Sequence, residues 1–129
     1  WWSGGHESIA AAAAARLPDD VPAFYRRGGK HLAHFSVDPD RWKNRSAKFL
    51  RRAEEGNHFL DLEDLGGQEL PGTDRCDGQR LIYYKLKKDP SRVGLLPYAI
   101  LENTDRLMVA FSDYRRMPGN ESVPMGCLV

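Results

Sequence analysis

Residues that could bind a metal ion are spread over the first half of this sequence. They are the N-terminal residue, two histidines and two aspartates: Trp1, His6, Asp40, His58 and Asp61. Zinc binds imidazole nitrogen and carboxylate oxygen, and a free α-amine with its own carbonyl oxygen closes a five-membered chelate. The residue types therefore allow a zinc site, although four histidines among 129 residues would also be distributed in this way by chance.

His31 and His34 form a second candidate pair. Their i, i+3 spacing places both rings on one face of a helix, which suits metal binding. No carboxylate partner accompanies them, so we expect ordinary surface histidines at these two positions.

Three short motifs around the first set are more specific than the single residues. The chain opens with Trp-Trp-Ser-Gly-Gly-His at residues 1–6, and it carries Val-Asp-Pro-Asp-Arg-Trp-Lys at residues 37–43 and His-Phe-Leu-Asp at residues 58–61. In order and spacing they resemble the N-terminal half of the zinc-dependent phospholipase C and single-strand-specific nuclease superfamily. Members of that family open with Trp-x-x-x-Gly-His and a helix, continue with a Trp-Ala-Asp or Trp-Pro-Asp turn, and then carry His-Phe-x-Asp.

This resemblance implies a mostly α-helical fold and a cluster of up to three zinc ions that hydrolyses phosphate esters. By position, the amine and carbonyl of Trp1 and the ring of His6 would bind one zinc, and Asp40 and His58 another. Asp61 is expected to hydrogen-bond a ligand histidine, with a salt link to the N-terminus or a solvated carboxylate as alternatives. A nuclease or nucleotidase acting on nucleic-acid phosphodiesters or 3′-phosphates is favoured over a phospholipase C, because the spacing from Trp1 to His6 and the Asp-Pro-Asp turn look more like the nuclease branch.

The second half departs from the family pattern. Family members are roughly twice as long and supply further ligands from a C-terminal His-x-x-x-Asp motif, whereas no histidine follows His58 here. We therefore expect residues 1–116 to be the N-terminal portion of one helical zinc-hydrolase domain with an incomplete fold, and residues 117–129 to be an irregular tail. Each zinc would lack at least one ligand, so the chain alone is expected to bind zinc weakly and to hydrolyse little or nothing.

A basic segment follows Asp40, with Trp42 and Phe49 inside it. Residues 41–52 hold six cations, and those expected to contact a substrate phosphate are Arg41, Lys43, Arg45 and Lys48. Since Lys and Arg neutralise phosphates and aromatic rings stack on bases, the segment supports an alternative function, a non-catalytic helical module that binds nucleic acid or another anion. Two further alternatives are a solvated helix face with Phe49 and Leu50 turned to the core, and an interaction domain in which the motifs are relics.

Helices are expected to position these residues. An alanine-rich helix is predicted at residues 6–17, entered through flexible glycines and ended by Pro18, and a second begins at Asp19 and is weakened by Gly28-Gly29. Further helices are predicted at about residues 46–55, 79–88 and 91–115, with turns or loops at residues 38–40 and 66–78. No segment has a convincing strand pattern, so the predicted fold class is mostly α.

Apolar side chains with helical spacing are predicted to face the core. In the last two helices these include Ile82, Tyr84, Leu96, Ile100, Leu107, Ala110 and Phe111. The tyrosines Tyr83, Tyr84 and Tyr98 are expected to pack rather than to recognise a ligand.

Composition limits the class of protein without identifying a partner. The chain is 41% hydrophobic and 29% charged with a net charge of +1, which is globular composition. No apolar run approaches the ~18 residues of a membrane span. If Trp1 is the mature N-terminus left by a signal peptidase, the protein is secreted or periplasmic. Cys76 and Cys127 then form a disulfide or remain free thiols, and the sequence leaves both open.

Overall fold

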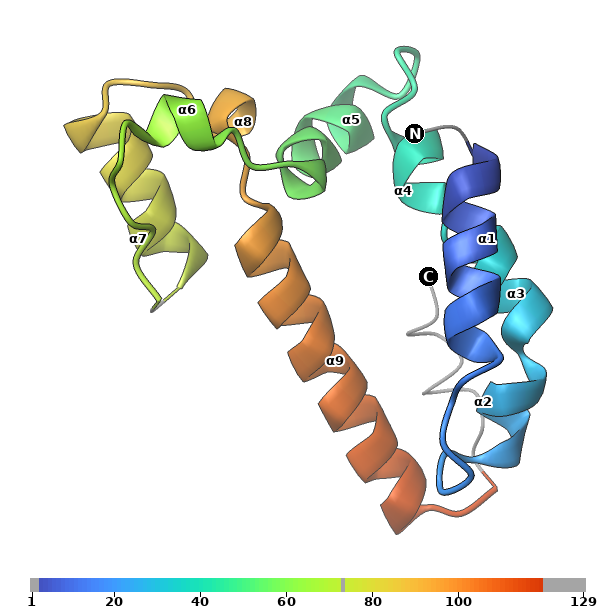
Figure 1. Ribbon diagram of the computed structural model, residues 1–129. Helices are drawn as coiled ribbons and strands as arrows, with labels where there is room; N and C mark the ends of the chain where they lie inside the picture. The colour runs from blue at the N-terminus through green and yellow to red at the C-terminus, as the bar shows by residue number, and fades with distance from the viewer. Residues whose placement is uncertain (1–2, 73, 120–129) are drawn as a thin grey trace. The chain divides into compact units, whose positions relative to one another are not determined.

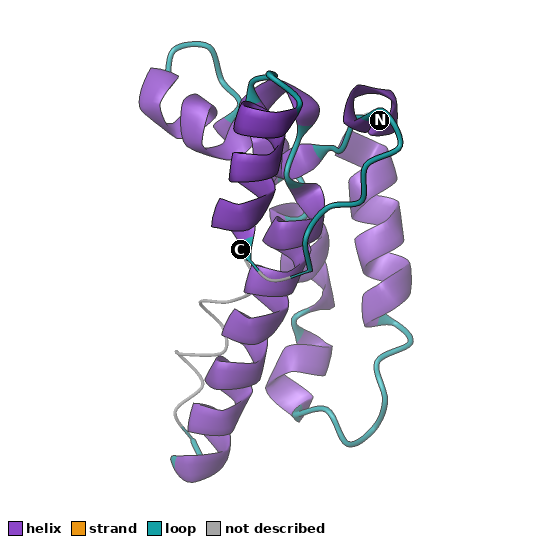
Figure 2. Cartoon of the chain, turned by 90° about the vertical axis from the view of Figure 1, so that its left-hand side faces the viewer, coloured by secondary structure: helices purple, strands orange, loops and turns teal. Residues whose placement is uncertain are grey.

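The structure is a computed structural model that describes residues 3–72 and 74–119. Within these residues it contains helices and turns and no strand, which confirms the predicted mostly α class (Figure 2). None of the helices in these two ranges is both long enough and apolar enough to cross a membrane.

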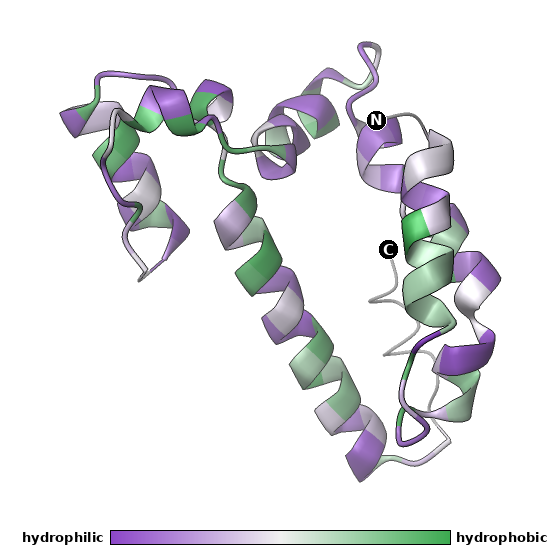
Figure 3. Cartoon of the chain, in the orientation of Figure 1, coloured by the Kyte–Doolittle hydropathy of each residue, from purple (hydrophilic) through white to green (hydrophobic). Residues whose placement is uncertain are grey.

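The chain divides into two compact units, which we describe separately. Unit 1 consists of residues 1–41 and 105–129, and unit 2 consists of residues 42–104. The long helix α9, Leu96–Arg116, contributes its first half to unit 2 and its second half to unit 1. Figure 3 shows hydrophobic and hydrophilic residues alternating along this helix, as its predicted amphipathic pattern requires.

Unit 1 begins with the alanine-rich helix α1, Ser3–Ala14, which packs against α3, Gly29–Phe35 (Figure 1). The two helices approach closely at a glycine, because a Cβ on Gly29 would lie 3.2 Å from the Cβ of Ala14. The short helix α2, Ala23–Arg27, precedes α3, and Gly28 separates the two. The helix predicted from Asp19 is thus interrupted at Gly28, which confirms that the glycines weaken it.

Aromatic rings fix α2 against the second half of α9. The ring centroids of Phe24 and Tyr114 are 5.0 Å apart, and those of Tyr25 and Phe111 are 5.2 Å apart. Phe24 and Ala110 are both buried, so this contact is part of the small apolar core of unit 1. Unit 1 also contains most of α4, Asp38–Trp42, which is the last helix before unit 2.

Unit 2 is built from short helices around a compact core. They are α5 Lys48–Glu54, the 3₁₀-helix η1 Glu55–His58, α6 Leu62–Leu65, α7 Arg75–Arg80, the π-helix η2 Leu81–Lys85, α8 Pro90–Val93 and the first half of α9. The core residues are Leu65, Ile82, Val93, Leu95 and Tyr98. Ile82 and Val93 are fully buried, and the Tyr98 hydroxyl donates a hydrogen bond to the Pro71 carbonyl at 2.7 Å.

Several predicted boundaries were wrong for local reasons. Gly4 and Gly5 lie inside α1 instead of forming a flexible entry to it. The Asp-Pro-Asp sequence at residues 38–40 is the first turn of helix α4 and not a simple turn, because proline is well tolerated in the first turn of a helix. The predicted loop at residues 66–78 ends early, because the Asp74 carboxylate accepts a hydrogen bond from the Asp77 N–H and starts α7.

Four side chains predicted or allowed to face the core are exposed instead. Phe49 is 94% exposed, which excludes the alternative in which this ring turns to the core. Tyr83, Tyr84 and Ile100 are 59%, 66% and 56% exposed. The expected packing of the two tyrosines was therefore wrong, and the helical spacing of apolar residues misplaced Tyr84 and Ile100. Tyr98, in contrast, packs as predicted and is only 4% exposed.

Candidate metal centre

His6 of α1 and Asp40 of α4 meet in unit 1. The His6 Nε2 atom lies 3.3 Å from the Asp40 Oδ2 atom, and the two side chains are 41% and 32% exposed. The pair joins residues 34 positions apart in the chain. The sequence had assigned these two residues to different zinc ions, and the structure brings them together.

The distance between the two donor atoms suits a shared zinc ion. Zinc in proteins is tetrahedral with bonds of about 2.0–2.1 Å to nitrogen and oxygen, so neighbouring ligand atoms lie about 3.3–3.4 Å apart. The observed 3.3 Å between Nε2 and Oδ2 equals this spacing. The same distance also fits an ion pair between the His6 ring and the Asp40 carboxylate.

His58 lies in unit 2, at the end of η1, on a segment that backbone hydrogen bonds hold in place. The Leu95 N–H donates to the Gly56 carbonyl at 2.6 Å, the Leu96 N–H to the Phe59 carbonyl at 3.2 Å, and the Asp61 N–H to the Val93 carbonyl at 2.7 Å. These three bonds join residues 56–61 to residues 93–96 on both sides of His58.

The close approach at this point requires a glycine. Gly94 has a φ of +94°, and a Cβ there would lie 2.1 Å from the Phe59 carbonyl oxygen. Only glycine adopts this conformation without strain and leaves room for the oxygen atom. The backbone around His58 therefore depends on one residue that has no side chain.

One ring nitrogen of His58 makes a hydrogen bond, and the other has no hydrogen-bond partner among the described residues. Its Nδ1 atom lies 2.8 Å from the Glu54 carbonyl oxygen, and because that oxygen can only accept, Nδ1 carries the proton. Its Nε2 atom is buried and has no hydrogen-bond partner within the described ranges. A metal-binding histidine characteristically donates its second ring N–H to a carbonyl in this way, so the tautomer suits a ligand role for Nε2.

A polar network next to His58 was not predicted from the sequence. The Arg75 guanidinium donates two hydrogen bonds to the Glu102 carboxylate, both at 2.7 Å, and a third to the Asn57 Oδ1 atom at 2.7 Å. The Asn57 amide in turn donates to a Glu54 carboxylate oxygen at 3.1 Å. These contacts span up to 27 positions in the chain, and no local pattern signals them.

Asp61 lies in an acidic group and does not contact the His58 ring nitrogens. Its carboxylate is exposed, and its pKa is raised by a hydrogen bond with Glu63, by partial desolvation, and by the negative charges of Asp64 and Glu63. This environment corresponds to the solvated-carboxylate alternative for Asp61.

Trp1 lies outside the described residues, and so does Cys127 with any disulfide that it forms. Cys76 is exposed in α7. Within residues 3–72 and 74–119, no three His, Cys, Asp or Glu side chains gather at one point. His31 and His34, both exposed, lie in α3, where the His34 Nε2 atom is 3.4 Å from the Arg41 guanidinium.

The four cations expected to contact phosphate differ in their surroundings. The Arg41 guanidinium is paired with the Asp38 carboxylate, and the positive charge of Lys43 helps to lower the pKa of Glu55, which the Arg51 hydrogen bond lowers most. Arg45 and Lys48 are exposed and have no hydrogen bond or ion pair to any described residue. Arg45 and Lys48 are therefore the two cations best placed to meet a ligand.

We compared the chain with known proteins, and no family model, no curated protein and no solved structure matches it. The resemblance carried by the three motifs stays a prediction.

Proposed function

We propose that this chain carries part of the zinc site of a phosphoester hydrolase, with nucleic-acid phosphodiesters or 3′-phosphates as its substrates. The observation that supports the proposal best is the 3.3 Å distance between the His6 Nε2 and Asp40 Oδ2 atoms. That spacing is the one that two ligands of a single tetrahedral zinc ion adopt. The bare Nε2 atom of His58 is a further donor of the right chemistry.

The residues have separate roles in this proposal. His6 and Asp40 bind zinc, the Trp1 amine and carbonyl complete the same site, and His58 provides a ligand for a further zinc. Zinc at such a site supplies Lewis-acid polarisation of a phosphoryl oxygen and activates water near neutral pH. Arg45 and Lys48 neutralise phosphate charge on the substrate.

Zinc affinity tests the proposed site. We expect titration calorimetry to show that His6→Ala and Asp40→Asn each weaken zinc binding by roughly tenfold or more, because each removes one of few ligands. His31→Ala removes a histidine of the same unit that lacks a carboxylate contact, and it should leave the affinity unchanged. Equal affinities for the unmodified chain and for His6→Ala would contradict the proposal.

The N-terminal ligand has its own test. One extra residue before Trp1 converts its amine into an amide, which no longer offers a free nitrogen lone pair to a metal. The extended chain should bind zinc more weakly than the chain that starts at Trp1. An unchanged affinity would remove Trp1 from the proposed site and leave His6 and Asp40 in it.

Hydrolysis is tested with an activated phosphodiester such as bis(p-nitrophenyl) phosphate. We expect little turnover by this chain, because few ligands gather among its described residues, and we expect a chelator and Asp40→Asn each to abolish what is measured. Turnover that persists in the presence of the chelator would show that the catalysis does not depend on zinc.

One observation favours a second candidate function, a helical module that binds nucleic acid through residues 41–52. Phe49 is 94% exposed on α5 and lies between exposed cations, Lys48 and Arg52. An aromatic ring in such surroundings can stack on a base while the cations contact the backbone phosphates. Folding does not explain the position of this ring, because burial of a phenylalanine normally stabilises the folded state.

The two functions separate in a binding assay with a single-stranded oligonucleotide. For the second function, binding survives chelation, weakens steeply with salt and falls roughly tenfold in Phe49→Ala. Leu62→Ala is the matched control, because Leu62 is also exposed, at 66%, but lies outside the basic segment 41–52. Binding that requires zinc and is insensitive to Phe49→Ala would exclude the second function.

A further inference from the structure

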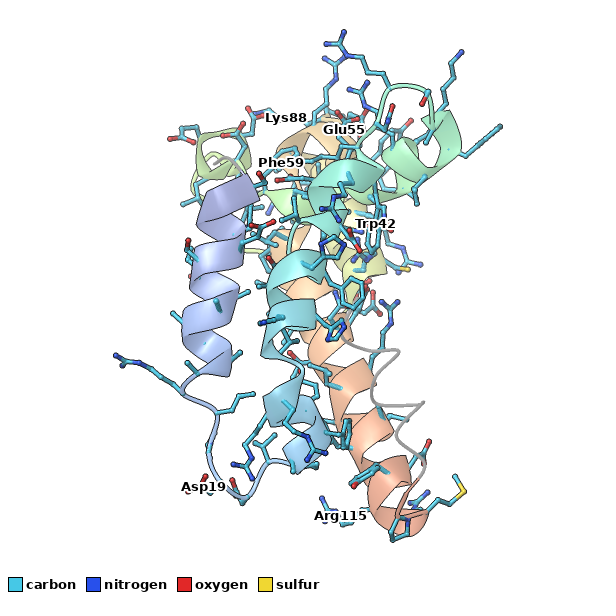
Figure 4. All side chains as sticks on the ribbon, turned by 90° about the vertical axis from the view of Figure 1, so that its right-hand side faces the viewer. Asp19, Trp42, Glu55, Phe59, Lys88 and Arg115 are labelled. Carbon is cyan, nitrogen blue, oxygen red and sulfur yellow. The ribbon has the colours of Figure 1, made fainter. Side chains whose placement is uncertain are left out.

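A pocket of about 610 Å³ lies in unit 2, outside all of the residues considered so far for zinc binding. Its lining residues are Tyr83, Lys87, Lys88, Asp89 and Pro90. They belong to the π-helix η2, to the connection from η2 to α8, and to the first residue of α8. Figure 4 labels Lys88, which is one of the residues that line the pocket.

The aromatic wall of the pocket is an exposed ring. Tyr83 is 59% exposed and meets its neighbour Tyr84 edge to face, with ring centroids 5.0 Å apart. Both rings lie in the π-helical turn, a conformation that is rare and occurs frequently at functional sites. Tyr84 is equally exposed, at 66%, but it does not line the pocket.

Lys87 has an unusual backbone conformation. Its φ is +57°, the left-handed region, and it is the only residue other than glycine in the described ranges with a positive φ. The Lys88 N–H donates to the Ile82 carbonyl at 3.1 Å across this turn, where a chain usually has glycine. Strained positions of this kind concentrate at sites that hold a ligand.

The charges around the pocket leave one cation unpaired. The Lys88 ammonium bonds the Asp64 carboxylate at 2.7 Å and the Asp64 carbonyl at 2.8 Å. The Asp89 carboxylate accepts hydrogen bonds from the Ser91 N–H and hydroxyl, which lower its pKa, as do the charges of Arg92 and Arg52. Lys87 is exposed and has no hydrogen bond or ion pair to any described residue.

We propose that this pocket binds an aromatic ring that carries a phosphate, with the ring against Tyr83 and the phosphate on the ammonium of Lys87. Two sources share this chemistry: a free nucleotide and the phosphorylated end of a nucleic-acid strand. The inference goes beyond the proposed hydrolase function and does not depend on it, because no proposed zinc ligand lines the pocket.

The test is a titration of the full chain in the presence of a chelator, so that zinc chemistry plays no part. The probes are adenosine 5′-monophosphate, adenosine, inorganic phosphate and a 5′-phosphorylated oligonucleotide. We expect the nucleotide to bind at least about tenfold more tightly than adenosine or phosphate alone, since only the nucleotide uses both the ring and the charge. A further gain of about tenfold for the oligonucleotide that is lost in Lys87→Gly identifies a strand end, and equal affinities identify a free nucleotide.

Paired variants locate the binding. Tyr83→Ala and Lys87→Gly should each weaken nucleotide binding by roughly tenfold, whereas Tyr84→Ala and Lys30→Ala, which remove a neighbouring ring and an exposed charge that does not line the pocket, should change it by less than about twofold. Lys87→Gly suits the left-handed backbone, so a loss of binding in this variant is not a loss of folding. If Tyr83→Ala unfolds, Tyr83→Leu replaces it.

Absence of saturable nucleotide binding would overturn the inference. Equal weakening by Tyr83→Ala and Tyr84→Ala would also overturn it, because the pocket would then not be the binding site. Neither outcome bears on zinc binding by His6 and Asp40, which is measured without the chelator.

Discussion

His6 and Asp40 in unit 1, and His58 in unit 2, are candidate ligands that the chain positions in different ways. The unit 1 pair stands on two helices and is partly exposed, and a side-chain contact of 3.3 Å joins the two residues. Backbone hydrogen bonds hold the segment on both sides of His58. The His58 Nδ1 atom donates a hydrogen bond to the Glu54 carbonyl, and its Nε2 atom is buried. The His6–Asp40 contact therefore depends on how the two helices pack, whereas backbone hydrogen bonds hold the segment that carries His58.

Two helices of unit 2 begin with a side-chain cap. In unit 2 the carboxylates of Asp74 and Asp89 cap α7 and α8. The helices α2 and α3 in unit 1 and α5 and α6 in unit 2 begin without a side-chain cap. Figure 4 shows Asp19 and Arg115 at the same end of unit 1, where a pocket of about 460 Å³ is lined by Phe111, Tyr114 and their neighbours.

The largest expected effect comes from Gly94→Ala. The new Cβ would lie 2.1 Å from the Phe59 carbonyl oxygen, and φ is +94°, so we expect a loss of about 3 kcal/mol or more in the free energy of unfolding. Gly29→Ala is the matched change in unit 1, where the new Cβ would lie 3.2 Å from Ala14, and it should cost only about 1 kcal/mol. Urea unfolding measures the loss for both variants. Equal losses would contradict the expectation that the backbone near His58 tolerates a side chain less well than the contact between α1 and α3.

Arg75→Ala should have the next largest effect. It removes the bidentate bond to Glu102 and the bond to Asn57, and we expect a loss of about 1–2 kcal/mol in the free energy of unfolding. Arg80→Ala removes an exposed pair with Asp77 and should cost less than about 0.5 kcal/mol. If the two variants are equally stable, the network next to His58 does not stiffen unit 2.

A smaller effect with a defined pH dependence is expected from Asp89→Ala. The hydrogen bonds from Ser91 lower the pKa of Asp89 in the folded chain, so its contribution is present above the unfolded pKa of ~3.9 and is lost as the pH falls through the lower folded value. Loss of this cap should cost about 1 kcal/mol at neutral pH. Thermal unfolding at neutral pH and near pH 3 checks this, and a difference between variant and parent that is independent of pH would contradict it.

The smallest expected effect has the opposite sign. The pKa of Asp61 is raised by its hydrogen bond with Glu63 and by the charges around it, so the ionised carboxylate destabilises the folded chain at neutral pH and protonation relieves this at low pH. Asp61→Asn should therefore raise the melting temperature slightly at neutral pH and not at acidic pH. A lower melting temperature at neutral pH would show that the carboxylate has a stabilising contact.

Local sequence signals predicted the helices well where one residue type dominates. The alanine run gives α1, and Gly28 separates α2 from α3, because helix propensity and backbone freedom act over a few neighbours. The left-handed turn at Lys87 was not predicted, because residues 79–88 were expected to form one helix. For Phe49 the sequence left open both an exposed ring that stacks on bases and a ring turned to the core, and residue types alone do not decide between them.

The sequence named the residues of the candidate site but did not predict which of them lie in contact. The motifs pointed to His6, Asp40 and His58, but the contact between His6 and Asp40 depends on how α1 and α4 pack. The Nδ1 bond of His58 and the Arg75 network depend in the same way on tertiary structure. Spacing along the chain does not indicate which residues this far apart in sequence come into contact.

Histidine side-chain NMR during a zinc titration tests the central claim most directly. We predict that zinc shifts the Nε2 resonance of His6, that this shift disappears in Asp40→Asn, and that the resonances of His31 and His34 stay in place. A zinc titration that leaves His6 unchanged, or that shifts His31 and His34 instead, would contradict the assignment of His6 and Asp40 as a zinc site.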